Sequence, residues 1–527
     1  MPMFAYSSIL TCLILLPLVS ALIIAMLPSA GTRLIRNAAL AVCAGELALA
    51  IAVARLLNWH AGWQLMQHMA WFGGLSFTVG ADPLTGLTVL ALTGMGLITV
   101  LASYVVEEQI KTWYVLLLVL LACLLGAVCS MDLILQAAFG AISILPGYFL
   151  LGLWGGASRR AAAMKYALVS TLGAMALFIS IMLIWLHSGP LPVAPGHAAA
   201  AARLPHPAAV TAFAGLQSFD IRRFDLLMAG HGGWLAFMLL MAAVAIRMGL
   251  PGGHIWIPDT MAEGAAPALG LVVGGNFIVG VLTLLHLAIP LFFNQFMLHR
   301  SGLVAWGIGG LLYAALCALA QNDFRRLIGY WLISQAAMVL ICAVSLQQNG
   351  IQAIELFAAG DVVTLMLLLW SGHVLARRTA GRDLNSLGGI AALSPEFFAL
   401  AIIGFLAGMA CPGLGLFPAE LLAAMANFRA AHLDNSVAAA GWFHNHAFIF
   451  AAFGSALGFA LLAAGLYWAM ERIFLGTPRP EYHHFTRLTV MERIVFLLLI
   501  AGEFALGLLP AAMVLSPAGH CLLPGVK

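Results

Sequence analysis

The stretch Arg247-Met-Gly-Leu-Pro-Gly-Gly-His-Ile-Trp-Ile-Pro-Asp259 interrupts a long apolar part of the sequence, and Gly408-Met-Ala-Cys-Pro-Gly-Leu-Gly-Leu-Phe-Pro-Ala-Glu420 interrupts another. In both, a Pro-Gly pair stands at the same place, a second proline follows six or seven residues later, and a carboxylate ends the stretch. Proline removes a backbone donor and glycine loosens a helix, so each pattern predicts a helix that is broken near the middle of its apolar stretch. These residues alone leave open the alternative of two ordinary loops that end helices at Pro-Gly.

Outside these two stretches the chain is strongly apolar. Of its 527 residues, 63% are hydrophobic and 8% are charged, whereas a soluble domain is about 45–50% apolar and about 25% charged. A water-exposed surface cannot be built from so few charges, which excludes soluble enzymes, nucleic-acid binders and disordered scaffolds. The net charge of +3 is too small to indicate a polyanionic partner. The composition therefore predicts a polytopic membrane protein.

Apolar runs of membrane-spanning length recur along the chain. A spanning helix needs about 20 mostly apolar residues, and roughly fourteen such runs can be counted. None shows the short alternation of a membrane β-strand, and a backbone in hydrocarbon must satisfy its hydrogen bonds within its own segment, which favours helices. We therefore predict an all-α polytopic membrane protein with about fourteen transmembrane helices. The first run, Ser8 to Leu27, has no basic residue before it and is expected to be a retained first helix.

The loops between the runs suggest an orientation in the membrane. The longest loop, between about His187 and Asp225, is rich in Ala, Pro and His and contains no catalytic constellation, so we expect a surface excursion between helices six and seven. Lys and Arg are concentrated in the odd-numbered loops. This asymmetry predicts that the odd-numbered loops are cytoplasmic and that both termini lie on the other side.

The sequence contains no pattern typical of a cofactor site. None of the eight cysteines forms a C-x-x-C pair, and most of them lie inside apolar runs, where a thiol behaves as a small hydrophobe. We find no ligand pattern for an iron–sulfur cluster, zinc or haem, no dinucleotide-binding glycine motif and no P-loop. We expect no metal ligand, no cofactor-binding residue and no redox site on this chain.

Several stretches together carry a resemblance to a known family. They are Val79-Gly-Ala-Asp82-Pro-Leu, Leu145-Pro-Gly-Tyr-Phe-Leu-Leu-Gly-Leu-Trp154-Gly-Gly, His254-Ile-Trp256-Ile-Pro258-Asp259, Ala320-Gln-Asn-Asp323-Phe-Arg325-Arg326-Leu-Ile-Gly-Tyr330 and Arg472-Ile-Phe-Leu-Gly476. In their order and spacing, from about Pro17 to Pro510, the chain resembles the proton-translocating antiporter-like membrane subunits of respiratory complex I. It most closely resembles the NADH-quinone oxidoreductase subunit M.

The resemblance implies two inverted five-helix repeats, helices four to eight and helices nine to thirteen, in which helices seven and twelve are the broken pair. It divides the chain into an N-terminal three-helix segment at 1–110, a first antiporter-like repeat at 111–300, a second at 301–480 and a C-terminal helix at 481–527. The resemblance thus favours the broken-helix interpretation of both Pro-Gly stretches over the ordinary-loop alternative.

The resemblance also identifies candidates for a proton path. They are Lys165 on helix six, Arg247 and His254 on helix seven and Glu420 on helix twelve. An ionisable group at the centre of a membrane helix costs about 2.5–3.5 kcal/mol or more, so each is a functional candidate by default. His254 is expected to be a hydrogen-bond partner at the helix break rather than a proton relay. No catalytic residue in the strict sense is expected.

Several positions depart from the family pattern where a titratable residue is usual. Arg247 replaces the helix-seven lysine, and arginine, with a pKa above about 12, stays charged where a lysine could release its proton. Because the glutamate that would pair with it is Ala141 here, we expect the chain's own proton path to be degenerate. The other departures are Ile278 for the helix-eight lysine, Ser334-Gln335 for the serine–histidine pair of helix ten, and Ala358-Ala359-Gly360 for the asparagine–histidine–glycine of helix eleven.

Four further carboxylates lie inside apolar runs, and Glu46 among them has no family counterpart that we can assign. Glu46 on helix two is expected to face a partner helix, and Glu503 on helix fourteen is expected to be interfacial. Glu355 and Asp361 on helix eleven stand six residues apart, not quite on one helix face, and are a less favoured candidate for a substitute polar path.

The preferred functional hypothesis is a membrane-arm subunit of an NADH–quinone oxidoreductase in the inner (plasma) membrane of a bacterium. It would couple electron transfer to proton translocation at the level of the complex, with NADH, flavin, iron–sulfur clusters and quinone on partner subunits. Its partners would be other membrane-arm subunits and the lipid bilayer, with no nucleic acid. The alternatives are the equivalent subunit of a membrane-bound hydrogenase, a cation/proton antiporter or an inorganic-carbon uptake complex, and a structural spacer that does not pump.

Overall fold

The structure of the chain is a computed structural model that describes residues 8–71, 76–187, 233–379, 381, 383–434, 442–478 and 485–510. Most of the predicted surface excursion between helices six and seven lies outside these described residues, as does Cys521.

The elements of the N-terminal half are nearly all long helices, joined after the second helix by a two-stranded antiparallel hairpin. In chain order they are α2 (Ile9–Met26), α3 (Thr32–Leu56), β1 (Gln64–Ala70), β2 (Ser76–Ala81), α4 (Pro83–Ala102), α5 (Ile110–Cys129), α6 (Leu133–Ile142), α7 (Ile144–Leu153), α8 (Arg159–His187), α11 (Trp234–Met248), α12 (Ile257–Glu263), α13 (Ala266–Leu269), α14 (Gly275–Leu282) and α15 (Ile289–Leu291).

The described elements of the C-terminal half are all helices. They are α16 (Phe293–Leu298), α17 (Arg300–Leu319), α18 (Phe324–Ser345), α19 (Gln348–Thr379), α20 (Ile390–Leu393), α21 (Pro395–Gly408), α22 (Leu416–Asp434), α23 (Trp442–Phe474) and α24 (Val490–Leu508).

Eleven segments of the described chain are helical, long and apolar enough to cross a membrane. One of them is formed by α6 and α7 together, and another runs continuously from α13 to α15. Two shorter apolar helices, α11 and α21, are followed after a break by α12 and α22, and α24 is a further helix of 19 residues. The described residues thus confirm the predicted all-α membrane fold with eleven candidate spans, and the predicted number of about fourteen crossings stays a prediction.

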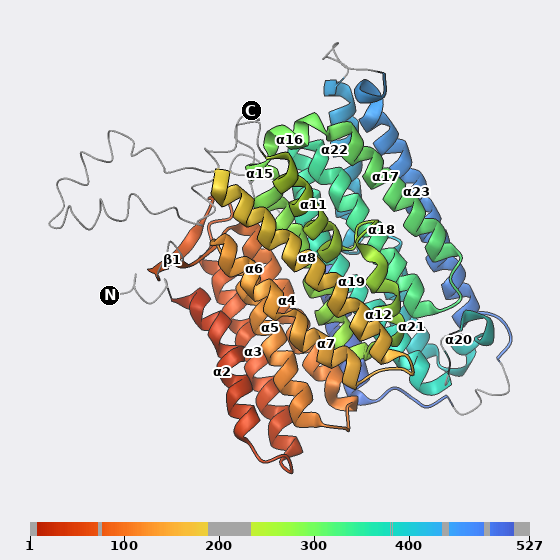
Figure 1. The fold of residues 1–527 in the computed structure, drawn as a ribbon. Coiled ribbons are helices and arrows are strands. Elements are labelled where there is room, and N and C mark those ends of the chain that lie inside the picture. The colour runs from red at the N-terminus through yellow and green to blue at the C-terminus, as the bar shows by residue number, and fades with distance from the viewer. Residues whose placement is uncertain are drawn as a thin grey trace.

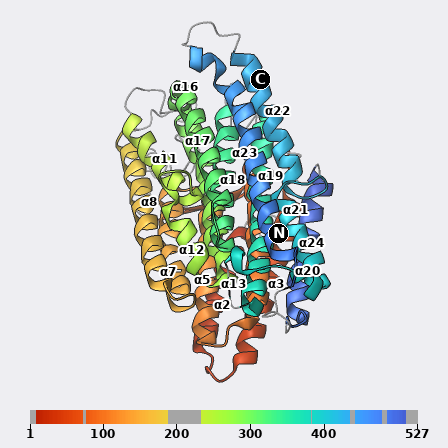
Figure 2. The same cartoon turned by 90° about the vertical axis from the view of Figure 1, so that its right-hand side faces the viewer.

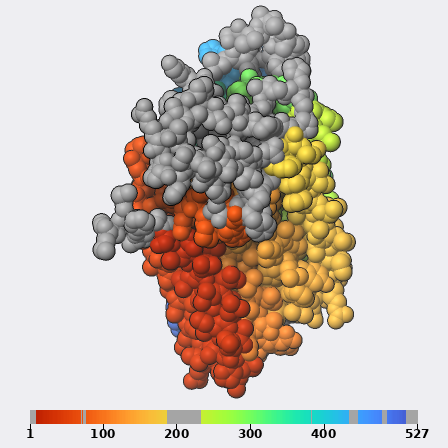
Figure 3. Space-filling model, turned by 60° about the vertical axis from the view of Figure 1, so that its left-hand side comes forward, coloured from red at the N-terminus to blue at the C-terminus, as the bar shows by residue number. Residues whose placement is uncertain are grey.

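The centre of the bundle is formed by α18, α19 and the continuous helix from α13 to α15. Of the 18 most apolar consecutive residues in each of these segments, 94%, 94% and 100% are buried inside the molecule. The corresponding shares are 39% for α2 and 28% for α3. Figures 1 and 2 show α18 and α19 between the outer helices in both views. Figure 3 shows the N-terminal helices, in red, forming one side of the bundle beside the orange and yellow helices.

Helix seven is interrupted between α11 and α12. Gly249 ends α11 in the left-handed conformation, with φ +86°. A Cβ at Gly253 would lie 2.6 Å from the backbone of Ala245, so only glycine fits there. Pro258 then occupies the first turn of α12. Because both α11 and α12 pack against α8, they are two parts of one crossing.

Helix twelve is interrupted in a similar way between α21 and α22. Ala410 and Gly413 both adopt left-handed backbone conformations, with φ +47° and +91°, and α22 begins at Leu416. Both α21 and α22 pack against α19 and α23. The two Pro-Gly stretches are therefore broken helices, as predicted, and not ordinary loops.

Tryptophan side chains satisfy backbone carbonyls that the two breaks leave without helical partners. Trp306 of α17 donates its indole N–H to the carbonyl of Pro251, with an N···O distance of 3.1 Å. Trp331 of α18 donates in the same way to the carbonyl of Gly408, also at 3.1 Å. Because no water is available in hydrocarbon, such side-chain donors are what makes an interrupted helix tolerable there.

The odd-numbered loops lie together at one end of the bundle. The N–H of Gly156 donates to the carbonyl of Glu263 at 2.8 Å, and the N–H of Leu384 donates to the carbonyl of Asn322 at 2.8 Å. Figure 1 shows α7, α12 and α20 towards this end, whereas β1, α15 and α16 lie towards the other. The crossings therefore alternate in direction, as the predicted topology requires.

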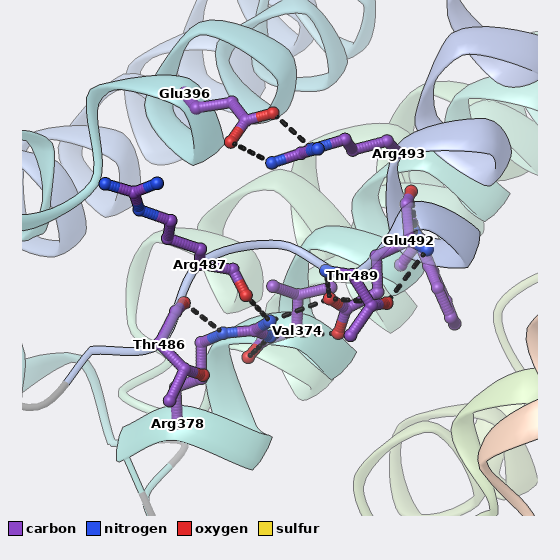
Figure 4. Close-up of polar contacts among 9 residues, drawn as sticks. Val374, Arg378, Glu396, Thr486, Arg487, Thr489, Glu492 and Arg493 are labelled. Carbon is purple, nitrogen blue, oxygen red and sulfur yellow. Dashed lines mark hydrogen bonds and ion pairs between the residues drawn. The ribbon is translucent and has the colours of Figure 1, made fainter.

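An ion-pair cluster at this end joins α19 to α24 (Figure 4). The guanidinium of Arg378 binds Glu492 in a bidentate manner, with N···O distances of 2.9 and 2.7 Å. These side chains are only 7% and 2% exposed. Glu492 also forms a capping box with Thr489 at the start of α24. A second pair, Arg493 with Glu396, has an N···O distance of 2.6 Å but is 41% and 45% exposed.

We predict that the substitution Glu492→Gln destabilises the protein far more than Arg493→Gln does. Glutamine can still serve in the capping box, so the first substitution mainly leaves the buried Arg378 charge without its counter-charge, which costs about 3–5 kcal/mol. Breaking the exposed Arg493–Glu396 pair should cost about 0–1 kcal/mol. Thermal unfolding of the purified variants measures both effects, and equal, small shifts for the two would contradict the assignment.

Candidate functional site

Lys165 lies near the odd-loop end of the bundle, in an ion pair with the carboxylate that ends the helix-seven motif. Its Nζ is 2.6 Å from Oδ2 of Asp259, and Nη2 of Arg326 on α18 is 3.4 Å from Oδ1 of the same carboxylate. The Lys165 and Asp259 side chains are 40% and 33% exposed. The Lys165 side chain is thus directed to the broken helix rather than extended unpaired to the membrane surface.

Arg247 lies in the last turn of α11 and is almost fully buried. Its Nη1 is 3.4 Å from the amide oxygen of Asn276 on α14. The guanidinium packs on Gly140 of α6, where a Cβ would clash with Nη2, so glycine makes room for the charge. Among the residues that the structure describes, no carboxylate forms an ion pair with Arg247.

Ala141, the position of the family's glutamate, faces outward next to Gly140. It lines an apolar cavity of about 660 Å³ between α6, α7 and α8, together with residues such as Leu145 and Phe178. The cavity wall is mostly hydrocarbon, and the lining residues of this cavity include no carboxylate that could pair with Arg247.

His254 stands at the break of helix seven and is partly exposed. Its Nε2 lies 3.2 Å from the hydroxyl of Tyr313 on α17, and the two rings meet edge to face at a centroid distance of 5.3 Å. The predicted hydrogen-bonding role of His254 therefore has a partner in the structure, and its part in proton transfer stays a prediction.

Helix eight contains polar residues that the sequence analysis did not single out. Ile278, at the family's lysine position, is fully buried, but Asn276, Thr283 and His286 lie on the same helix. Their spacing of seven and three residues places them on one broad face. The stretch Thr283–Ala288 is a π-helical turn, a local geometry that is frequent at functional sites.

His286 meets Asp82 at the end of the bundle that holds the hairpin. Asp82 caps α4 through a hydrogen bond from the N–H of Thr85, and its Oδ2 lies 3.0 Å from His286 Nε2. The ring of Trp63 lies 4.9 Å from that of His286. Burial opposes ionisation of Asp82, but the adjacent His286 and the hydrogen bonds from His286 and Thr85 lower the pKa of this carboxyl below its ordinary value.

A second helix-capping carboxylate at this end is Asp132, at the start of α6, and its pKa is shifted in the opposite direction to that of Asp82. It accepts hydrogen bonds from the N–H groups of Ile134, Leu135 and Ser76 and from the Ser76 hydroxyl. No cation faces it among the described residues, and burial raises the pKa of the Asp132 carboxyl above its ordinary value.

Three carboxylates come together in the second half of the molecule: Asp361 on α19, Glu420 on α22 and Glu503 on α24. Glu503 accepts hydrogen bonds from the Thr364 hydroxyl at 2.6 Å and from the N–H of Gly415 at 3.1 Å. Asp361 lies within range of electrostatic interaction with both Glu420 and Glu503. The sequence analysis placed only Glu420 in the candidate site.

The expectation that Glu503 is interfacial is wrong, and the helices that Glu46 faces belong to its own chain. Both residues are 0% exposed in the single chain, because helices of the same chain enclose them. For Glu503 these are α4, α19, α21 and α22, all of which pack against α24. Glu355 is also buried and interacts electrostatically with Asp82.

The structure brings some of the predicted site residues together and separates others. Lys165 and Arg247 lie in the same half, on either side of Tyr166, whose hydroxyl is 3.4 Å from the Asn276 amide nitrogen. Glu420 lies in the other half with Asp361, and no described contact joins it to Arg247. The missed residues were visible as ionisable or polar side chains inside apolar runs, but their partners stand too far away in the sequence to be inferred.

The comparison with known families agrees with this architecture. The family described as NADH:quinone oxidoreductase/Mrp antiporter, transmembrane, matches residues 130–443, more than half of the chain. The NADH-quinone oxidoreductase subunit M of Rhodobacter capsulatus is 25% identical over 519 residues, which are 96% of this chain and 94% of that protein.

Solved structures share the fold over almost the whole chain. One chain of respiratory complex I from Thermus thermophilus with bound NADH matches with a TM-score of 0.80 at 22% identity, covering 97% of this chain and 98% of that one. One chain of the Mrp complex from Dietzia sp. matches with a TM-score of 0.81 at 17% identity, covering 99% and 98%. At these identities the likeness shows the fold alone.

We predict opposite pH dependences for the substitutions Asp82→Asn and Asp132→Asn. Asparagine caps a helix as well as aspartate does, so each change mainly removes a charge. Because the pKa of Asp82 is lowered in the folded protein, its ionised form stabilises the fold above about pH 4, and this contribution is lost as pH falls through the folded-state pKa. Asp82→Asn should therefore destabilise at neutral pH, and its effect should shrink in acid.

Asp132→Asn is the matched control. Because the pKa of Asp132 is raised, its ionisation is penalised in the fold, and wild type gains stability relative to this variant as pH falls through the folded-state pKa. The thermal midpoints of wild type and both variants between about pH 3.5 and pH 7 measure these slopes. Parallel curves for the two variants would refute the assignment of the two caps.

Proposed function

The chain belongs to the NADH:quinone oxidoreductase/Mrp antiporter transmembrane family, and on that premise we propose that it is a membrane-arm subunit of an NADH–quinone oxidoreductase in the plasma membrane of a bacterium. The observation that carries this proposal is the alignment with a bacterial subunit M over 96% of this chain and 94% of that protein. Because the alignment covers nearly the whole of both chains, it supports the proposal that this chain occupies the position of subunit M in its complex.

In such an assembly this chain supplies a membrane-embedded ion path and its partners supply the redox chemistry. NADH, flavin, iron–sulfur clusters and quinone would be bound by partner subunits, and the remaining membrane-arm subunits would be its neighbours. The support is that members of this family are antiporter-like transmembrane subunits, and that the ionisable groups of this chain lie within a helical bundle.

The ion path of this chain differs in character between its two halves. In the first half the Lys165 ammonium is paired with Asp259, and the Arg247 guanidinium, which cannot release its proton at neutral pH, rests on Asn276 and Gly140. We infer that Arg247 acts as a fixed positive charge that orders water and opposes leakage. The titratable group on the second broken helix is Glu420.

The switch that the family builds from a glutamate and a lysine would be absent at this point. Ala141 offers no carboxylate to tune the charge at Arg247, and the wall of the adjacent cavity is apolar. We therefore infer that this subunit transports fewer protons per electron than the family pattern allows, through a route that ends on Glu420.

Two other functions follow from the same residues and fold. The likeness to a chain of an Mrp complex favours the equivalent subunit of a cation/proton antiporter. The loss of titratable groups at Ala141 and Ile278 favours a structural spacer whose pump has decayed. Each alternative predicts an activity of the purified assembly that differs from the activity expected under the main proposal.

Co-purification tests the assignment to a redox complex. We expect NADH:quinone reductase activity to be isolated from solubilised membranes of the native organism with an affinity-tagged copy of this chain, because the chain is proposed to lie inside that complex. A tagged, unrelated multi-pass protein from the same membranes is the control. Isolation of sodium/proton exchange or hydrogenase activity in place of NADH oxidation would overturn the assignment.

Proton transport by the whole complex tests the path. In proteoliposomes, Ala141→Glu combined with Arg247→Lys should raise the number of protons moved per electron, because it restores a tunable pair. Glu420→Gln should remove the residual share of this chain. The control is Arg247→Lys alone, which supplies the lysine without its carboxylate. A ratio that is unchanged in Glu420→Gln would mean that the chain conducts nothing along this line, and the spacer function would stand.

A further inference from the structure

Glu503 connects the last helix of the chain to the break of helix twelve. Its Oε2 accepts the N–H of Gly415, the residue directly before α22, and its Oε1 accepts the hydroxyl of Thr364 on α19. A Cβ on Gly415 would lie only 3.0 Å from Oε2, so the absence of a side chain there permits the close approach. Glu503 thus places a carboxylate at the N-terminus of α22, where the helix dipole favours a negative charge.

Asp361 lies one helical turn before Thr364 on α19 and is 0% exposed. Neither of its carboxylate oxygens has a hydrogen-bond partner within the described part of the chain. Both Glu420 and Glu503 act on it electrostatically. The carboxylate oxygens of Asp361 are therefore not engaged in hydrogen bonds between helices, whereas those of Glu503 are.

The surroundings of the three carboxylates limit how much charge they can carry together. Cys342 on α18 is the further titratable group beside Glu420. The helix α4, which packs against α19 and α24, contains no Asp, Glu, His, Lys or Arg between Pro83 and Ala102. Like charges in a low-dielectric interior repel strongly, and the described contacts provide no cation to offset them. The cluster is therefore expected to hold protons rather than three negative charges.

The hydrogen bonds decide where a single negative charge is best accommodated. Glu503 receives two donors and lies at a helix N-terminus, and both features favour a carboxylate. Asp361 receives no donor from the described residues. A single negative charge in the cluster is therefore best accommodated on Glu503.

We propose that Asp361 is a proton carrier that supplies Glu420 in the second half of the chain, and that Glu503 is the positioning residue whose fixed charge at the break of helix twelve drives this supply. The inference rests on the proposed function, and it adds two residues to the path. When Glu420 gives up its proton, the O–H bond of Asp361 breaks, the proton passes through water between the two carboxyls, and a new O–H bond forms on Glu420. One proton moves, no electron does, and Asp361 is left as the anion.

The repulsion between that anion and Glu503 gives the step its direction. Two negative charges in the cluster are unfavourable, so Asp361 takes up the next proton, and the cluster returns to a single charge on Glu503. Without the charge on Glu503, a deprotonated Asp361 would persist and the path would stall.

The first test replaces Asp361 in the whole complex. In proteoliposomes with NADH as the electron donor, Asp361→Asn should lower the number of protons moved per electron by the same increment as Glu420→Gln. The matched control is Glu46→Gln, because Glu46 is also 0% exposed, has no hydrogen-bond partner for either oxygen among the described residues, and lies on α3 outside the cluster. The control should leave the ratio unchanged.

The second test addresses the positioning role of Glu503 without removing a carboxylate. Thr364→Val keeps the shape of the side chain and deletes the hydroxyl that Glu503 accepts, whereas Thr364→Ser keeps the hydroxyl and loses a methyl group. If the hydrogen bond matters, Val should lower the ratio and Ser should restore it to the wild-type value. If Thr364 contributes only packing, Thr364→Val should keep the wild-type ratio and Thr364→Ser should lower it. This pair decides the proposal even where Asp361→Asn prevents assembly of the complex.

The outcomes separate this proposal from the proposed function. A complex that retains NADH:quinone reductase activity, loses protons per electron in Glu420→Gln and loses none in Asp361→Asn would overturn the role of Asp361 and leave the proposed function intact. Equal ratios for Thr364→Val and Thr364→Ser would overturn the role of Glu503. An unchanged ratio in both carboxylate variants would overturn proton conduction by this chain, and the reductase activity would still report its membership of the complex.

Discussion

The structure depends on one constraint, that a backbone polar group inside hydrocarbon must find its hydrogen-bond partner within the protein. Two of the crossings interrupt their own helical hydrogen bonds, and side chains from other helices of the chain supply hydrogen-bond partners at each break. Trp306 and Trp331 donate to carbonyls at the two breaks, and Glu503 accepts an N–H that begins α22. The helices that supply these groups, α17, α18 and α24, are therefore held in place by the same bonds that make the breaks possible.

The buried charges near the two helix breaks have opposite signs. At the first break the buried charge is a guanidinium, Arg247, which rests on an amide and a glycine backbone. At the second break the buried charges are carboxylates, of which Glu503 is bonded directly to the broken helix. A cation that cannot release its proton and a cluster that has to share protons are not equivalent. The likeness of the two breaks in backbone geometry therefore does not extend to their buried charges.

Much of the fold and part of the site could be predicted from the sequence. The apolar runs indicated the crossings, and the Pro-Gly pairs indicated both breaks, because these signals are local properties of the backbone. Lys165, Arg247, His254 and Glu420 followed from a family resemblance, but their partners did not. The assignment of Glu503 to a subunit interface failed because an apolar helix surface has the same composition whether it faces lipid, another subunit or its own chain.

The sequence by itself determined that the chain is a bundle of membrane helices, which of them are broken, and that titratable groups are missing at Ala141 and Ile278. Only the tertiary structure decided which of the remaining ionisable groups meet. Asp361 and Glu503 are separated by well over one hundred residues, and it is the packing of α24 against α19 and α22 that brings them to one site. The physical reason is that helix formation and helix breaking depend on neighbours in the chain. The environment of a buried charge depends on side chains that the fold brings in from other helices.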